Sequence, residues 1–329
     1  MKYNYLLSLT VAFLFLTIFN SCEKKEHPII LPPGSDAIPG RINMGENYET
    51  QVFYDFETNS VVKTSDCSSW DLAFESDKDG YHLWMNGGKG VLIANSHAED
   101  FKTFTTVPAS ITTASFLFDD PSGNADSTAL GNWRDTRNAT KGEVYIAKLN
   151  DTSFYKFRLL AVTDSSYSMA WCNIKSIHPD TIVLRKDPDY NFIYFSFTSG
   201  LVTPEPAKNT WDVVFTRYRF IYRDLNNFQY YVNGVLLNPY NTSAASDSTM
   251  KFANIDATTI TKEVVSHNRD VIGFDWKKYN FTTARYEVNP DKNYILNTRN
   301  GQMIKLHFLD FYSSTGVKGS PSFESERLR

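Results

Sequence analysis

Apolar and polar residues alternate along most of the chain with the period of two that is typical of β-strands. The alternation is clear over residues 52–62, 143–162, 193–202 and 293–312, and turn-forming Asn, Asp, Ser or Gly residues interrupt or end these stretches. Few stretches keep a helical period of 3.6 residues for more than two turns. The pattern therefore predicts an all-β fold of antiparallel sheets with few or no long helices.

Two of the predicted strands carry nearly the same sequence. Residues 68–76 read SSWDLAFES and residues 209–217 read NTWDVVFTR. The shared motif positions are Trp70, Asp71, Phe74, Asn86 and Gly87 in the first copy, and Trp211, Asp212, Phe215, Asn233 and Gly234 in the second. We expect both tryptophans to point inward, both aspartates to accept a backbone N–H, and each Asn-Gly pair to form a hairpin turn. A catalytic carboxylate pair is the weaker interpretation, since each aspartate has a structural role in its own copy.

The order of these motifs predicts a tandem duplication. A late pair of strands completes each copy and carries Lys156 in the first and Lys305 in the second, and we expect both amines to reach solvent. The predicted modules are residues 45–178 and 188–329, with a short connector at 179–187. Because the connector is short and the chain is rich in Phe and Tyr, the modules are expected to pack together.

The N-terminus predicts export and lipid anchoring. Residues 1–21 contain an early Lys and an apolar run that is short for a membrane span, as in a signal peptide. Cys22 follows directly, as in a bacterial lipobox, and is expected to carry lipid; an ordinary leader or an uncleaved anchor is the alternative. Residues 22–44 continue as a polar and then Pro/Gly-rich stretch, which is typical of a flexible tether.

Composition narrows the possible functions. The formal net charge is −4 and the chain has no basic stripe, which argues against a nucleic-acid partner. Cys67 and Cys172 could form one disulfide or remain free thiols. No hydrolase or zinc-site motif is found, so we do not expect an enzyme. The Asp-rich stretch 118–135 lacks the order of an EF-hand loop and predicts a polar loop, either solvated or lying over a pocket mouth.

The Trp-Asp strands, the Asn-Gly segments, the late strand pairs and the lipoprotein leader together resemble the HmuY-like family of haem-binding outer-membrane lipoproteins of Bacteroidetes. The resemblance covers nearly the whole mature chain in two copies and implies two tandem HmuY-like β modules. It also implies anchoring at the outer membrane or cell surface, and iron acquisition by haem capture and passage to an uptake receptor of the TonB-dependent class. A non-catalytic lipoprotein that binds a glycan or a partner outer-membrane protein is the alternative.

Haem requires an apolar slot and axial atoms from His, Met, Cys or Tyr. In the family that this chain resembles, the ligands come from segments between the Asn-Gly turn and the late strand pair. Here those segments contain His97, Met250 and His267, while His82 and Met85 flank the first Asn-Gly pair. These five residues are the candidate axial ligands. The competing interpretations are exposed loop histidines and, for Met85, core packing.

Overall fold

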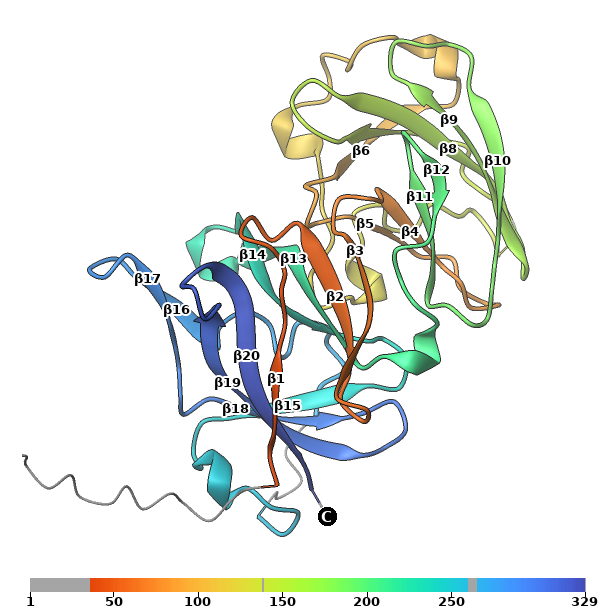
Figure 1. Cartoon of the computed structure of the whole chain (residues 1–329). Helices are drawn as coiled ribbons and strands as arrows, with labels where there is room; N and C mark the ends of the chain where they lie inside the picture. The colour runs from red at the N-terminus through yellow and green to blue at the C-terminus, as the bar shows by residue number, and fades with distance from the viewer. Residues whose placement is uncertain (1–35, 138, 260–264, 329) are drawn as a thin grey trace, which may run out of the picture. The chain divides into compact units, whose positions relative to one another are not determined.

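The computed structural model describes residues 36–137, 139–259 and 265–328 (Figure 1). The predicted signal peptide, the predicted lipidation site Cys22 and most of the predicted tether lie outside these residues. Within the described part of the chain, regular structure consists of β-strands and three-residue 3₁₀ helices, so the predicted all-β class is confirmed. None of the described helices has the length and apolarity that a membrane span requires.

The secondary structure follows the predicted alternation closely. The strands are β1 (Ile38–Arg41), β2 (Thr50–Asp55), β3 (Ser60–Asp66), β4 (Leu72–Glu75), β5 (Leu83–Met85), β6 (Leu92–Ala98), β7 (Val144–Lys148), β8 (Phe154–Val162), β9 (Ser166–Asn173), β10 (Asp180–Arg185), β11 (Phe192–Ser196), β12 (Gly200–Val202), β13 (Val213–Tyr222), β14 (Phe228–Leu237), β15 (Ser243–Asp247), β16 (Lys277–Asn280), β17 (Arg285–Val288), β18 (Asn293–Asn297), β19 (Met303–Tyr312) and β20 (Lys318–Arg327). The 3₁₀ helices are η1 (Phe101–Thr103), η2 (Thr113–Ser115), η3 (Ala125–Ser127), η4 (Lys208–Thr210), η5 (Arg223–Leu225) and η6 (Phe252–Asn254).

The strands form two sandwiches, each with its own core. Sandwich A consists of the sheets β10-β9-β8-β7-β6 and β12-β11-β4-β5, and sandwich B of the sheets β1-β20-β19-β18-β15 and β14-β13-β2-β3. β16 and β17 form a separate two-stranded hairpin. Both sheets of sandwich A contribute to one core around Phe74, Phe157 and Phe195, and both sheets of sandwich B to one around Phe215 and Phe308.

The two sandwiches do not follow the predicted division of the chain. Sandwich A is built from residues 72–202, and sandwich B from residues 38–66 together with 213–327. β2 pairs with β13, and β11 pairs with β4. Figure 1 shows the orange β2 and β3 beside the teal β13 and β14. The hairpin that precedes each Trp-Asp motif in the sequence therefore joins the sheet that carries the other Trp-Asp motif.

Two further segments differ from the prediction. Residues 38–44, expected to belong to the flexible tether, begin with β1 and then bury Ile42 and Met44 in the core of sandwich B. The predicted connector 179–187 contains β10, which pairs with β9 along its full length. Apolar burial explains the first difference, because the alternating Ile42 and Met44 lose almost all contact with water.

The second Asn-Gly pair does not form a turn, contrary to the prediction. Asn233 and Gly234 lie inside β14, and the hairpin between β13 and β14 turns at Asn226 and Asn227, which both have positive φ angles. A side chain at Gly234 would meet the carbonyl oxygen of Gly273 at 2.3 Å, so the glycine permits close approach of another backbone segment. The first pair does lie at a turn, but that turn leads from β5 to β6, which belong to different sheets.

Candidate functional site

The two Trp-Asp motifs form matching hydrogen-bond networks. Asp71 accepts the backbone N–H of Phe197 at 2.8 Å, and Asp212 accepts that of Phe56 at 2.9 Å. The aspartates therefore accept backbone N–H groups as the sequence predicts. Phe74 and Phe215 are fully buried, one in each core.

Asparagines complete these networks by binding the residues around each tryptophan. Asn86 donates to the carbonyl oxygens of Cys67 and Trp70 at 2.8 and 2.9 Å. Asn238 donates to those of Lys208 and Trp211 at 2.8 and 2.6 Å. The residue in the second motif that corresponds to Asn86 is therefore Asn238, five residues after the predicted Asn233.

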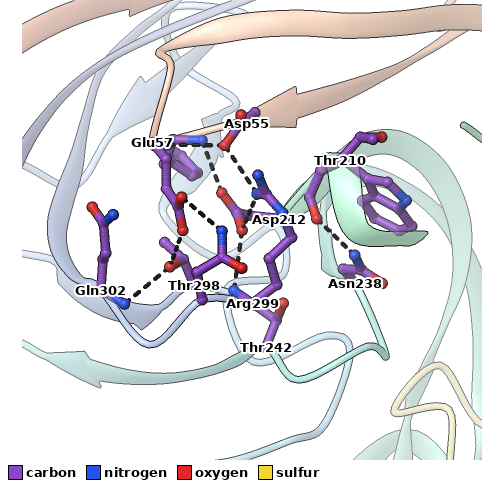
Figure 2. Close-up of polar contacts among 12 residues, drawn as sticks. Asp55, Glu57, Thr210, Asp212, Asn238, Thr242, Thr298, Arg299 and Gln302 are labelled. Atoms are coloured by element: carbon purple, nitrogen blue, oxygen red, sulfur yellow. Dashed lines mark hydrogen bonds and ion pairs between the residues drawn. The ribbon is translucent and has the colours of Figure 1, made fainter. Parts of the chain in front are cut away.

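Charged partners differ between the two motifs. Lys89 lies 2.7 Å from Asp71, whereas Arg299 lies 3.0 Å from Asp55 and 2.9 Å from Asp212. Figure 2 shows Arg299 between these two carboxylates. Burial raises the pKa of Asp212 to about 6, although the Phe56 and Arg299 bonds favour its ionised form. These carboxylates are occupied by backbone and guanidinium donors, as expected of a structural network.

The tryptophans differ in exposure. Trp211 is 1% exposed and packs edge-on against Phe53 at 4.9 Å between ring centroids. Trp70 is only half-buried, and it packs in the same manner against Tyr194 at 5.0 Å. The inward orientation expected for both is therefore complete for Trp211 alone.

The candidate histidine ligands are separated and mostly exposed. The side chain of His97 is 77% exposed and lies 3.1 Å from Glu143. The ring of His82 lies 2.7 Å from Glu75 and against the ring of Tyr81. His267 is exposed, with its Nδ1 3.2 Å from the carbonyl oxygen of Thr242.

The candidate methionines lie among apolar side chains. Met85 is 5% exposed and belongs to the core of sandwich A. Met250 packs against Ile255 and Ile295. Met85 and His267 line different pockets, so the structure does not bring the five candidates to one ligand site.

Lys156 and Lys305 are buried, and the prediction that their amines reach solvent is wrong. Lys156 Nζ donates to the carbonyl oxygens of Phe101 and Phe104, both at 2.5 Å. Lys305 Nζ donates to those of Phe252 and Ile255 at 3.2 and 3.0 Å. Each ammonium group thus fixes a 3₁₀ segment over a sheet face, and each also lies close to a phenylalanine ring.

Cys67 and Cys172 are free thiols, and both are buried. Burial raises the pKa of each thiol, which makes the reactive thiolate less accessible. The alternative of a disulfide between Cys67 and Cys172 therefore does not apply. Among the described residues, no cluster of three His, Cys, Asp or Glu side chains has the arrangement that a metal ion needs.

An aromatic groove lies between the end of the β13–β14 hairpin and the β16–β17 hairpin. It has a volume of about 560 Å³. Its aromatic walls include Tyr222, Phe228, Tyr230, Tyr279, Phe281 and Tyr286. Phe281 is 89% exposed, Tyr230 55% and Phe228 54%, so the rings of these residues are available to a ligand.

A buried lysine forms part of the groove. Lys277 Nζ donates to the carbonyl oxygen of Asn233 at 2.7 Å and lies 4.2 Å from the ring centroid of Trp276. Burial lowers the pKa of Lys277 to about 7. The next residue, Lys278, is exposed on the opposite side of the strand and also lines the groove. The groove thus combines aromatic rings with cationic groups.

Comparison with known proteins places the chain in a family. The sequence profile of the HmuY protein family matches residues 47–175 and 189–324. The chain belongs to the HmuY family. A search of the curated proteins gives no match.

Solved structures similar to this HmuY-family chain come from several bacteria. Apo PinO from Porphyromonas gingivitis is 11% identical, with 90% of this chain and 99% of that chain covered and a TM-score of 0.35. The apo HmuY analogue of Tannerella forsythia is 12% identical, with 89% and 96% covered and a TM-score of 0.26. A protein from Bacteroides vulgatus named as HmuY-like and haem-binding is 10% identical, with 90% and 94% covered and a TM-score of 0.24.

The groove of this HmuY-family chain meets part of the requirements of haem. Its exposed rings offer stacking surfaces, and its volume lies within the ~300–1,000 Å³ of typical ligand pockets. Among the residues that the structure describes, no His or Met lines it. The oxygen of a tyrosine, which can serve as an axial haem ligand, is present on Tyr222, Tyr230, Tyr279 and Tyr286. Sequence reasoning missed this groove because its residues come from hairpins far apart in the chain.

Proposed function

We propose that this HmuY-family chain binds haem or a related porphyrin in the aromatic groove. The observation that carries the proposal is the set of exposed rings around a groove of about 560 Å³. Exposed aromatic surface of this extent is costly in water, and covering it with a flat apolar ligand yields roughly 25 cal/mol per Å². Ring stacking adds to that gain.

The residues of the groove have separate roles in this proposal. Phe228 and Phe281 supply stacking surface, while the exposed ammonium of Lys278 pairs with ligand carboxylates. Tyr230 and Tyr279 are the exposed phenols from which an axial oxygen can come. Bound haem would supply an iron centre, and Tyr230 or Tyr279 would hold it through a phenol oxygen.

The open groove also fits a protein that passes its ligand on. The rings on its rim remain more than one-third exposed, so a ligand can leave toward a receptor without unfolding of a core. We propose that Cys22 anchors the chain to the outer membrane or cell surface by lipid, and that an uptake receptor of the TonB-dependent class takes the porphyrin. The matching Asp71 and Asp212 networks support two copies of one ancestral HmuY module.

Titration with hemin and with metal-free protoporphyrin tests the proposal. The mature chain is expected to shift the Soret band of hemin and to bind protoporphyrin as well, since ring stacking does not need iron. Phe228→Ala combined with Tyr230→Ala is expected to weaken both affinities about tenfold, corresponding to ~1.4 kcal/mol. His97→Ala and His267→Ala serve as controls and should leave both affinities unchanged.

Two results would overturn the proposal. Absence of a Soret shift with hemin in either redox state excludes haem binding by this chain. Loss of binding in His97→Ala or His267→Ala, with the Phe228 and Tyr230 double variant unaffected, excludes the groove as the site.

A further inference from the structure

A second pocket lies where the two sandwiches meet, away from the aromatic groove. We call it the arginine pocket, because Arg217, Arg219 and Arg269 all line it. Its volume is about 110 Å³, whereas a cavity that holds one water needs roughly 10–15 Å³. The pocket is therefore large enough for a ligand of several heavy atoms.

Arg219 forms no ion pair with a described carboxylate, although its charge acts on the neighbouring Asp119. It is 6% exposed, its Nη2 donates to the hydroxyl of Tyr231 at 3.2 Å, and its Nη1 has no hydrogen-bond partner. The guanidinium lies over the rings of Phe118 and Tyr231, at 5.4 and 5.5 Å from their centroids. A buried charge without a counter-ion is expensive, and the cost is recovered when an anion binds.

Two other buried donors on the same pocket also lack partners. These are the indole Nε1 of Trp211 and the hydroxyl of Tyr218, which are 1% and 5% exposed as residues. Burial raises the pKa of Tyr218 well above its usual range, so the hydroxyl keeps its proton. Unsatisfied buried groups are rare in native proteins. The unpaired Nη1 of Arg219, a residue that lines the pocket, indicates a ligand that accepts hydrogen bonds.

The remaining arginines add positive charge. Arg217 Nε donates to the carbonyl oxygen of Gly88 at 2.7 Å, and Arg269 Nε to that of Leu237 at 3.2 Å. Neither forms an ion pair with a described carboxylate, although both are held in place by these backbone contacts. The charge of Arg269 also acts on Glu205 and Asp270, and that of Arg217 on Asp66. Positioned guanidinium groups outside direct ion pairs are suited to a carboxylate ligand.

The acidic residues on the pocket offset only part of this charge. Asp120 is paired with Arg223. Asp119 accepts the backbone N–H groups of Met85 and Ala129, the latter at 2.7 Å, and forms no ion pair with Arg219. Burial raises the pKa of Asp119 to about 7, so a large share of it is neutral near pH 7. The polar loop predicted over a pocket mouth thus lines this pocket with Phe118 and Asp119.

The walls of the pocket are aromatic. Trp70, Trp84, Phe118 and Tyr194 line it together with the arginines. We propose that the arginine pocket binds a small organic carboxylate whose body is flat and apolar. The carboxylate pairs with the guanidinium of Arg219, while the apolar part lies among the rings. This site shares no lining residue with the aromatic groove, so its test is independent of porphyrin binding.

Calorimetric titration of the full mature chain with benzoate tests the inference, with benzamide as the neutral isostere. Benzoate is expected to bind and benzamide to bind at least tenfold more weakly. Arg219→Gln should weaken benzoate binding at least tenfold, while Arg185→Gln, which changes an exposed arginine of β10, should leave it unchanged. Without ligand, Arg219→Gln is expected to unfold at an equal or higher denaturant concentration, because an unpaired buried charge is removed.

Several outcomes would overturn the inference. If benzoate and benzamide bind with equal affinity, the charge of the ligand is not recognised. If inorganic phosphate binds as tightly as benzoate, the aromatic walls do not contribute to affinity. Absence of benzoate binding excludes the proposed ligand class. If Arg219→Gln does not fold, Arg219→Lys replaces it; full benzoate affinity in that variant contradicts recognition by the guanidinium fork.

Discussion

Asp71 accepts the backbone N–H of Phe197 at 2.8 Å, although 126 residues separate the two along the chain. Asp212 and Phe56 repeat this relationship across 156 residues. Each aspartate thereby holds the segment that follows the neighbouring strand, β11 in one case and β2 in the other. The Trp-Asp motif therefore joins distant parts of the chain, and this structural role explains why it occurs in both sandwiches.

Cleavage between β9 and β10 should leave the two fragments associated. A protease site inserted at residues 177–179, which are exposed, separates β1–β9 from β10–β20. The pairings of β10 with β9, β11 with β4 and β2 with β13 all cross this cut. The cleaved chain is expected to elute as one species on gel filtration in buffer and as two in urea. Separate elution in buffer would contradict these pairings.

The sequence predicted where strands lie along the chain and which face of a sheet their side chains occupy. Alternation placed Trp211 inward and the Trp-Asp carboxylates near backbone donors, because the period of two determines which face a residue occupies. It contained no information about strand partners, since any apolar face can pair with another of similar length. The exchange of β2 and β11 between the two sheets could therefore not be predicted.

The candidate axial ligands were predicted from their positions between the Asn-Gly pair and the late strand pair. Residues in such segments need not lie close together in the folded protein. His97 and His267 ended on exposed loops, while the exposed aromatic rings of the groove lie on hairpins whose relative placement depends on tertiary packing. The alternation Arg217-Tyr218-Arg219 in β13 was the one signal that could have indicated the arginine pocket. It puts two guanidinium groups on one strand face, beyond the residues that pair with β2.

Replacing either buried lysine by methionine should destabilise the fold. Lys156→Met and Lys305→Met each leave two carbonyl oxygens without their donor, and each is expected to lower the free energy of unfolding by about 2–4 kcal/mol. Urea denaturation measures the change. Lys102→Met and Lys251→Met alter exposed lysines of the same segments and should change it by less than ~0.5 kcal/mol. If the buried and the exposed Lys→Met variants change the free energy of unfolding equally, the ammonium contacts do not stabilise the fold.

Glu205 should make the protein less stable as pH rises. Glu205 is 1% exposed, and burial raises its pKa to about 7 from 4.5, although a bond from Asn191 and the charge of Arg269 favour ionisation. Between these values the folded state binds more protons than the unfolded state, so stability is fully present below pH 4.5 and is lost as pH rises through 7. Glu205→Gln keeps an acceptor for Asn191 and has no ionisable group, so the variant does not lose this stability as pH rises.

The gain from Glu205→Gln should therefore depend on pH. Relative to the natural chain, the variant is expected to be near neutral at pH 4.5 and more stable by up to roughly 3 kcal/mol at pH 8. Urea denaturation across this range measures the difference, with Glu46→Gln at an exposed site as the control. Parallel stability profiles for Glu205→Gln and the natural chain would contradict the raised pKa.

Gly88 should tolerate alanine much less well than its neighbour Gly87. A Cβ atom at Gly88 would lie 2.1 Å from the carbonyl oxygen of Arg217, which is backbone and cannot rotate away. At Gly87 the nearest atoms of Arg219 are 3.3 Å away, a distance that small shifts relieve. Gly88→Ala is thus expected to cost about 2–4 kcal/mol and Gly87→Ala less than about 1 kcal/mol. Because Gly88 also accepts from Arg217 at 2.7 Å, Gly88→Ala should displace this arginine and weaken benzoate binding. Similar stability in both variants would show that the turn does not dock on β13 as described.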